Sequence, residues 1–141
     1  MNKTCTALTL IAALALAPVV LARTASQPAL VSRLLQAAPN INPDALALAV
    51  DAMDCATQQA AERPARRLAV IDYSKPSAEQ RLWVFDLTAA KLLYAERVAH
   101  GAATGDNLSQ HFSNKPGSHQ SSLGLFRTSE TYQGANGYSL R

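Results

Sequence analysis

The pattern of apolar residues changes at residues 63–67. Before this segment, apolar residues recur every three or four positions, which is the spacing of an amphipathic helix. After it, short apolar runs alternate with turn-forming segments, which is typical of strands. The segment itself, Arg63-Pro64-Ala65-Arg66-Arg67, interrupts both patterns and indicates a linker. The sequence therefore predicts an α+β chain with a helical part followed by a β part.

Two helices are predicted before the linker. The first begins near Ser26 and Pro28 and ends at Pro39, and its apolar residues fall at helical spacing: Leu30, Val31, Leu34, Leu35 and Ala38. The second begins at Asn42, a favourable N-cap, and extends to about Ala61. Its start is reinforced by a proline and an aspartate, Pro43 and Asp44. Isolated helices of this length are marginal in water, so both are expected to dock on another element.

The β part is expected to form an incomplete, mainly antiparallel sheet. Three strands in a meander are predicted at residues 68–72, 81–87 and 91–99. Residues 101–122 are rich in Gly, Ser, Asn and His and indicate a loop. A fourth strand is predicted at 123–128, and residues 138–141 are the expected start of a fifth. So small a sheet exposes one apolar face and one edge with unpaired backbone groups, unless the helical part covers them.

The N-terminus has the layout of a secretory signal peptide. A basic start with Lys3 precedes a long stretch without charge, residues 4–22, composed mostly of Ala, Leu, Ile and Val. Small residues favour cleavage after Ala22, with Ala25 as the second choice. A permanent membrane anchor is the alternative, but the run is rich in Ala and contains Pro18. We therefore expect an exported protein of the periplasm or cell envelope, with no membrane contact after cleavage. The predicted organisation is signal peptide 1–22, helical extension 23–65 and β domain 66–141.

Composition narrows the class of protein. A length of 141 residues corresponds to one domain at most, and a 48% apolar share with 16% charged residues excludes a disordered tail. The net charge of +3 is spread along the chain, and its densest basic cluster is Arg63, Arg66 and Arg67. Aromatic residues make up 6% of the chain, with no stacking stripe on basic strands. We expect no nucleic-acid partner.

The residues that could carry chemistry form no recognisable constellation in the sequence. His100, His111 and His119 lie in the loop without the spacing of a metal site, and we expect such loop histidines to be exposed, with no metal or other cofactor. Ser118, Ser121 and Ser122 lie near His119, but no nucleophile elbow surrounds them, so they are interpreted as turn residues that bind backbone.

The helical extension offers a thiol and a pair of carboxylates. Cys55 lies in the second predicted helix beside Asp54 and is interpreted as a packed small hydrophobe rather than a nucleophile. After signal cleavage it is the one thiol that remains, so no internal disulfide is expected. Asp51 and Asp54 could pair as acid and base, but their position on the polar helix face favours a role in solubility.

The β part resembles a known family over residues 66–141. The resemblance rests on the order and spacing of five pieces: Val98-Ala99-His100-Gly101, Phe112-Ser113-Asn114, Gly117-Ser118, Ser121-Ser122-Leu123-Gly124-Leu125-Phe126, and the run from Tyr132 through Gly134 to Gly137-Tyr138-Ser139-Leu140-Arg141. Together they are similar to the murein L,D-transpeptidase catalytic-domain family, the YkuD-like branch with a helical N-terminal extension. Within this pattern, residues 122–126 occupy the place of a tight turn that enters a strand.

The resemblance implies cell-wall chemistry. Members of the family use a Cys thiolate to attack a carbonyl of the peptidoglycan stem peptide, form a thioester and pass the acyl group to an amine. A His acts as base and backbone N–H groups hold the oxyanion. The implied partner is therefore the peptidoglycan stem peptide.

The family's catalytic His-Gly and Gly-Cys-Pro motifs come after the segment that Ser139-Leu140-Arg141 matches. His100-Gly101 occupies an earlier strand-end position, and Cys55 lies in the helical extension. We therefore assign no catalytic, cofactor-binding or metal-binding residue, and whether the chain is itself an enzyme stays open. We expect the front part of a longer transpeptidase-like protein, inactive by itself. The alternative is a complete, non-catalytic envelope protein that keeps the β scaffold as a binding module.

Overall fold

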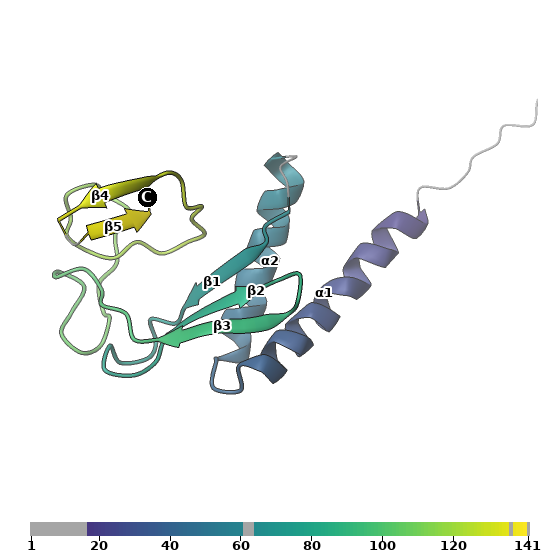
Figure 1. The fold of residues 1–141 in the computed structure, drawn as a ribbon, viewed down its shortest axis with the longest axis horizontal. Helices are drawn as coiled ribbons and strands as arrows, with labels where there is room; N and C mark the ends of the chain where they lie inside the picture. Colours follow the sequence, from purple (N-terminus) through teal and green to yellow (C-terminus); the bar gives the residue numbers. More distant parts are fainter. Residues whose placement is uncertain (1–16, 61–63, 136, 141) are drawn as a thin grey trace, which may run out of the picture.

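The computed structural model describes residues 17–60, 64–135 and 137–140, where two helices precede five strands (Figure 1). The elements are α1 (Ala17–Ala37), α2 (Pro43–Ala60), β1 (Arg67–Ile71), β2 (Leu82–Asp86), β3 (Lys91–Glu96), β4 (Thr131–Gly134) and β5 (Gly137–Leu140). The strands form two antiparallel sheets, β1-β2-β3 and β4-β5. The predicted α+β class and the antiparallel meander are confirmed.

The second helix begins where its capping residues predict. The side-chain Oδ1 of Asn42 accepts hydrogen bonds from the backbone N–H groups of Asp44 at 2.9 Å and Ala45 at 3.3 Å. These bonds satisfy two donors that the first turn of a helix leaves without intrahelical partners. One turn further on, Leu46 and Val50 are buried, so the apolar face of α2 is turned toward the core.

The first helix differs from its prediction. It begins by Ala17 rather than near Ser26, and Pro28 lies inside it. An interior proline removes one backbone hydrogen bond without necessarily ending a helix, and here the residues on its C-terminal side pack against the core. Pro28 was interpreted as a start signal because proline favours the first helical turn.

The alternation of buried and exposed residues fixes the register of the three-stranded sheet. In β1, Leu68 and Val70 are buried while Arg67, Ala69 and Ile71, which alternate with them, are exposed. They pair with Phe85 and Trp83 of β2, which are buried on the same face. The β2-β3 register shifts between Val84 and Phe85, which is a bulge in this pair. One face of the sheet is therefore strictly apolar and needs a cover.

The two helices provide this cover. Helix α1 contacts β3, and α2 contacts β1, and Figure 1 shows α2 behind the sheet with α1 beside it. The resulting core combines residues of the helices, of the α1–α2 connection and of the strands: Leu34, Ala38, Ile41, Leu46, Val50, Leu68, Val70, Trp83 and Phe85. The expectation that both helices dock is confirmed, and the sheet face that a small meander leaves open is closed by them.

The chain after β3 differs from its prediction in one element. The strand predicted at residues 123–128 is absent from the structure, and this segment is irregular, with Leu125 and Phe126 exposed. A strand needs a hydrogen-bonded neighbour, and the pairing forms instead further along the chain, between β4 and β5. The predicted strand near Tyr138 corresponds to β5. In Figure 1 this hairpin lies apart from the helix-backed sheet.

Most of the predicted signal peptide lies outside the described residues, and so the signal stays a prediction. Both predicted cleavage points, after Ala22 and after Ala25, fall within α1. Within the described ranges, neither helix is long and apolar enough to cross a membrane.

Candidate functional site

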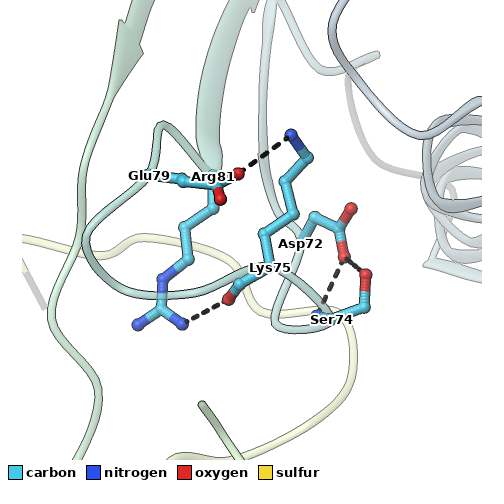
Figure 2. A network of polar contacts seen from close by, with 5 residues as sticks. All are labelled: Asp72, Ser74, Lys75, Glu79 and Arg81. Carbon is cyan, nitrogen blue, oxygen red and sulfur yellow. Dashed lines mark hydrogen bonds and ion pairs between the residues drawn. The ribbon is translucent and has the colours of Figure 1, made fainter. Parts of the chain in front are cut away.

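A buried arginine organises the end of the sheet. Arg81 precedes β2 and has no exposed surface, and its guanidinium reaches three segments of the chain. Its Nε and Nη2 donate to the carbonyl of Val98 at 3.1 and 2.8 Å. Its Nη1 donates to the carbonyl of Lys75 at 3.0 Å, and Figure 2 shows this bond. Nη1 also contacts Ser109 Oγ at 3.2 Å, and Nη2 contacts His100 Nδ1 at 2.8 Å. These five contacts match the five N–H donors of a guanidinium.

The arginine fixes the orientation of His100. Because a guanidinium only donates, Nδ1 of His100 must accept the hydrogen bond from Arg81. The opposite nitrogen, Nε2, then carries the proton and donates to the carbonyl of Gly105 at 2.9 Å. His100 is half-buried, so the expectation that the loop histidines are exposed is wrong for this residue. The sequence reasoning missed it because Arg81 lies far away along the chain.

The same cluster contains a serine and a histidine at the distance of a nucleophile and its base. Ser109 Oγ lies 3.0 Å from His100 Nδ1. A general base must become an imidazolium during proton transfer, however, and here the buried Arg81 cation touches the same nitrogen. Two cations in contact inside a protein repel each other strongly. The arrangement therefore favours a structural role for this pair over Ser-His catalysis.

A second set of hydrogen bonds holds the loop after β3. Thr104 is fully buried, and its hydroxyl accepts a bond from the N–H of Ser121 at 2.7 Å. Ser121 Oγ in turn accepts from the N–H of Gly101 at 2.9 Å. A Cβ on Gly101 would lie 2.4 Å from the carbonyl oxygen of His119, so glycine is required at this close approach. Hydrogen bonds between side-chain hydroxyls and backbone N–H groups, rather than an apolar core, thus fix the loop.

Beside these clusters lies a cleft of about 390 Å³. Its lining combines polar and apolar side chains from α2, β1, the turn after β1 and the loop: Ala45, Ile71, Asp72, Tyr73, Ser74, Ser109, Phe112 and Leu123. Tyr73 and Phe112 are in ring contact, with centroids 5.6 Å apart, which ties the loop to the end of β1.

Asp72 is the charged residue of this cleft. It is 5% exposed, and its Oδ1 accepts bonds from the N–H of Ser74 at 3.0 Å and from the Ser74 hydroxyl at 2.6 Å. Its Oδ2 is buried and has no hydrogen-bond partner among the described residues. Figure 2 shows this oxygen turned away from Ser74. Buried carboxylate oxygens without a partner are rare in folded proteins, so Asp72 marks the cleft as the candidate site.

The other residues singled out from the sequence are dispersed. His111 and His119 are exposed, as expected. Ser118 Oγ accepts from the N–H of Gln120, a local turn bond as predicted. Ser121 and Ser122 also bind backbone, but that of other segments, at Gly101 and Ser113 respectively. In the described ranges, no three His, Cys, Asp or Glu side chains are grouped so that they could hold a metal ion.

The interpretation of Cys55 as a packed residue is wrong. Its side chain is exposed on α2, and its Sγ lies 3.3 Å from Nε2 of Gln59, one turn further along the same helix. The apolar face of α2 is already occupied by Leu46 and Val50, and Cys55 falls off this stripe. Its neighbour Asp54 is hydrogen-bonded to Gln58, and Asp51 is exposed, so the two carboxylates are not bonded to each other.

A protein-family model described as the L,D-transpeptidase catalytic domain, of the YkuD-like type, matches residues 37–141. The chain belongs to this L,D-transpeptidase family. The match begins at the last residue of α1 and so includes α2, whereas the resemblance recognised in the sequence begins at residue 66. No curated protein and no solved structure matches the chain.

The residues that define the cleft were not recognised from the sequence alone. Asp72 and Arg81 are charged residues at the ends of apolar strands, and this placement was the available signal. A charge next to a buried strand is either solvated or engaged in a buried network. The sequence alone does not tell whether Arg81 is solvated or part of a buried network. The fold of the loop decides this, because it brings Ser109 and His100 to Arg81.

Proposed function

We propose that this chain is an exported, peptidoglycan-binding member of the L,D-transpeptidase family in the periplasm or cell envelope, and that it is inactive by itself. The family match over residues 37–141 is the observation that carries the proposal. The uncharged, Ala-rich run at residues 4–22 supports export. The partner would be the stem peptide, whose acyl group the family transfers through a cysteine thioester.

Neither Cys55 nor any of the three histidines is proposed as the cysteine nucleophile or the histidine base of the family's reaction. Two contacts support this exclusion. Cys55 Sγ lies next to Gln59 on an exposed helix face, and both ring nitrogens of His100 are engaged by other groups. A thioester-forming cysteine needs a base within hydrogen-bond reach and donors for the oxyanion. The 141-residue chain by itself is therefore expected to bind wall material without transferring acyl groups.

The binding part is tested by co-sedimentation of the chain with purified peptidoglycan sacculi. We expect the chain to pellet with the sacculi and to be released by an excess of free stem tetrapeptide. A chain that stays in the supernatant would contradict the proposed substrate. The compartment is tested by N-terminal sequencing of the protein recovered from the periplasm, with Arg23 or Ser26 as the expected first residue.

The catalytic part is tested by mass spectrometry after incubation with the stem tetrapeptide and an amine acceptor. We expect no acyl adduct on Cys55 and no cross-linked product, with identical results for the Cys55→Ala variant. An acyl adduct on Cys55 that is absent from this variant would overturn the assignment.

A further inference from the structure

The contacts of His100 oppose the uptake of a proton by its ring. The single lone pair of Nδ1 accepts from Nη2 of Arg81 at 2.8 Å, and the Ser109 hydroxyl also reaches this nitrogen at 3.0 Å. A proton on Nδ1 would turn the acceptor into a donor, so both contacts would be lost. It would also place an imidazolium against a guanidinium, which proteins do not deprotonate. The observed contacts therefore require the neutral ring.

The same contacts join the end of the sheet to the loop at residues 101–122. Nε2 of His100 donates to the carbonyl of Gly105 at 2.9 Å, and Ser109 belongs to the same loop. Arg81, which precedes β2, completes the set because its Nη1 lies 3.2 Å from Ser109 Oγ. Ser109 and Phe112 in turn line the cleft. Loss of the His100 contacts would therefore release the part of the loop that forms one wall of the cleft.

The other titratable side chains around His100 have different partners or are exposed. Asp72 is hydrogen-bonded within its own turn, and Lys75 lies next to Glu79. Tyr73 faces the buried guanidinium with its ring, whose centre lies 5.2 Å from the guanidinium carbon. In the described part of the chain, no carboxylate is hydrogen-bonded or ion-paired with His100 to stabilise an imidazolium. The remaining titratable residues of the adjoining segments are exposed: Glu96, Arg97, Asp106 and His111.

We propose that His100 is an acid-sensitive latch, which holds the loop at residues 101–122 against the end of the sheet while neutral and releases it when Nδ1 takes up a proton. Histidine side chains in peptides titrate at about pH 6.5. The released loop binds one more proton than the docked loop, so docking weakens as the pH falls below this value, by up to about tenfold per pH unit. This inference does not depend on the proposed function of the chain.

The experiment measures hydrogen-exchange protection factors of the unaltered chain by NMR from about pH 8 to about pH 5.5, a range above the titration of ordinary carboxylates. Two amides report on the loop. The N–H of Ser77 donates to the carbonyl of Asn107 at 2.8 Å, across the junction between sheet and loop, and that of Gln110 donates to Thr104 within the loop. We expect protection at both to fall by up to about tenfold per pH unit below about pH 6.5, while the amides of β2 keep theirs.

The three histidines of the loop region provide matched variants. His100→Asn keeps an oxygen that can accept from Arg81 but cannot take up a proton in this range, so protection should no longer depend on pH. His111→Asn and His119→Asn make the same change at exposed positions and should respond as the unaltered chain does. Asparagine suits His119, whose φ is +55°. A response that persists in His100→Asn, or that either control abolishes, would overturn the proposal, as would constant protection in the unaltered chain.

If His100→Asn does not fold, nitrogen NMR of the imidazole rings in the unaltered chain decides. At about pH 8, His100 should carry its proton on Nε2 alone. Protonation of Nδ1 should then coincide with shifts of the Gly105 and Ser109 amide signals and with the loss of protection at Ser77. A His100 ring that gains a proton on Nδ1 while these signals stay unchanged would overturn the proposal.

Discussion

The helix-backed sheet and the segment that follows it are stabilised by different forces. In the sheet unit, formed by α1, α2 and β1–β3, Trp83 and Phe85 are almost completely buried within one apolar core. In residues 97–140, Thr104 is the buried residue among those described, while Phe126 and Tyr138 are 66% and 73% exposed. Burial of apolar side chains stabilises the first region, as in most small domains. The conformation of the second region is held by hydrogen bonds.

The contact between the two regions combines a buried polar cluster with an aromatic pair. Arg81, at the start of β2, binds Val98, His100 and Ser109 of the second region, and Phe112 contributes an aromatic contact with Tyr73. Strands β4 and β5 pair with each other, and among the described helices and strands no other element packs extensively against them. An isolated two-stranded hairpin is marginally stable in water. We therefore expect the first region to keep its fold when the second is destabilised, and we do not expect the reverse.

The largest expected effect comes from truncating the core of the sheet unit. Phe85→Ala should lower the free energy of unfolding by about 4 kcal/mol, because it leaves a cavity beneath both helices. The matched truncation in the second region, Tyr138→Ala, should change it by less than about 0.5 kcal/mol because that ring is exposed. Urea denaturation followed by circular dichroism measures both. Similar losses in the two variants would show that the hairpin shares the core's stability.

An intermediate effect is expected where the two regions meet. Arg81→Met should destabilise the chain by about 3 kcal/mol, since it leaves buried acceptors at Val98, Lys75 and His100 without donors. Hydrogen exchange should show the loss concentrated in residues 97–122, with β1–β3 still protected. Arg67→Met, at an exposed position in β1, is the control and should be nearly neutral. An equal loss of hydrogen-exchange protection in both regions would contradict the expectation that the second region unfolds while the first stays folded.

The sequence predicted the first region much better than the second, for a physical reason. Apolar periodicity and capping are local signals, so α2 and strands β1–β3 were expected within a few residues of their observed bounds. Their packing follows from the same pattern, because an apolar sheet face needs a cover. Even here, Pro28 was misread because its local preference for a helix start was outweighed by packing further along α1.

The second region depends on contacts between residues distant in sequence. The strand expected at residues 123–128 has suitable residues, but its formation required a partner that the fold does not provide. The candidate site could not be predicted for a related reason. Asp72, Arg81 and Ser109 are unremarkable in the sequence, and they gain significance because the loop returns to the end of β1. Family resemblance could name the chemistry, but it could not place these side chains.

The smallest expected effect is a loss of stability at low pH as carboxylates take up protons, and we expect it to come from the first region and not from the second. In the β2–β3 turn, the backbone N–H of Ala89, with that of Thr88, lowers the pKa of Asp86 below its ordinary value of 3.8. In the second region, the hydroxyl of Ser129 lowers the pKa of Glu130. A bond between adjacent residues can also form in the unfolded chain, whereas the Asp86 bonds need the folded turn. Linkage to folding is therefore expected from the Asp86 bonds and not from the bond between Ser129 and Glu130.

Because the folded-state pKa of Asp86 is depressed, its contribution is fully present above the unfolded-state pKa and is lost as pH falls through the folded-state pKa. The stability of the unaltered chain should therefore decline more between about pH 5 and pH 2.5 than that of Asp86→Asn, which keeps an oxygen for the turn but cannot ionise. Glu130→Gln should follow the unaltered chain. Urea midpoints measured across this pH range provide the comparison, and an acid response removed by Glu130→Gln instead would show that the second region folds together with the first.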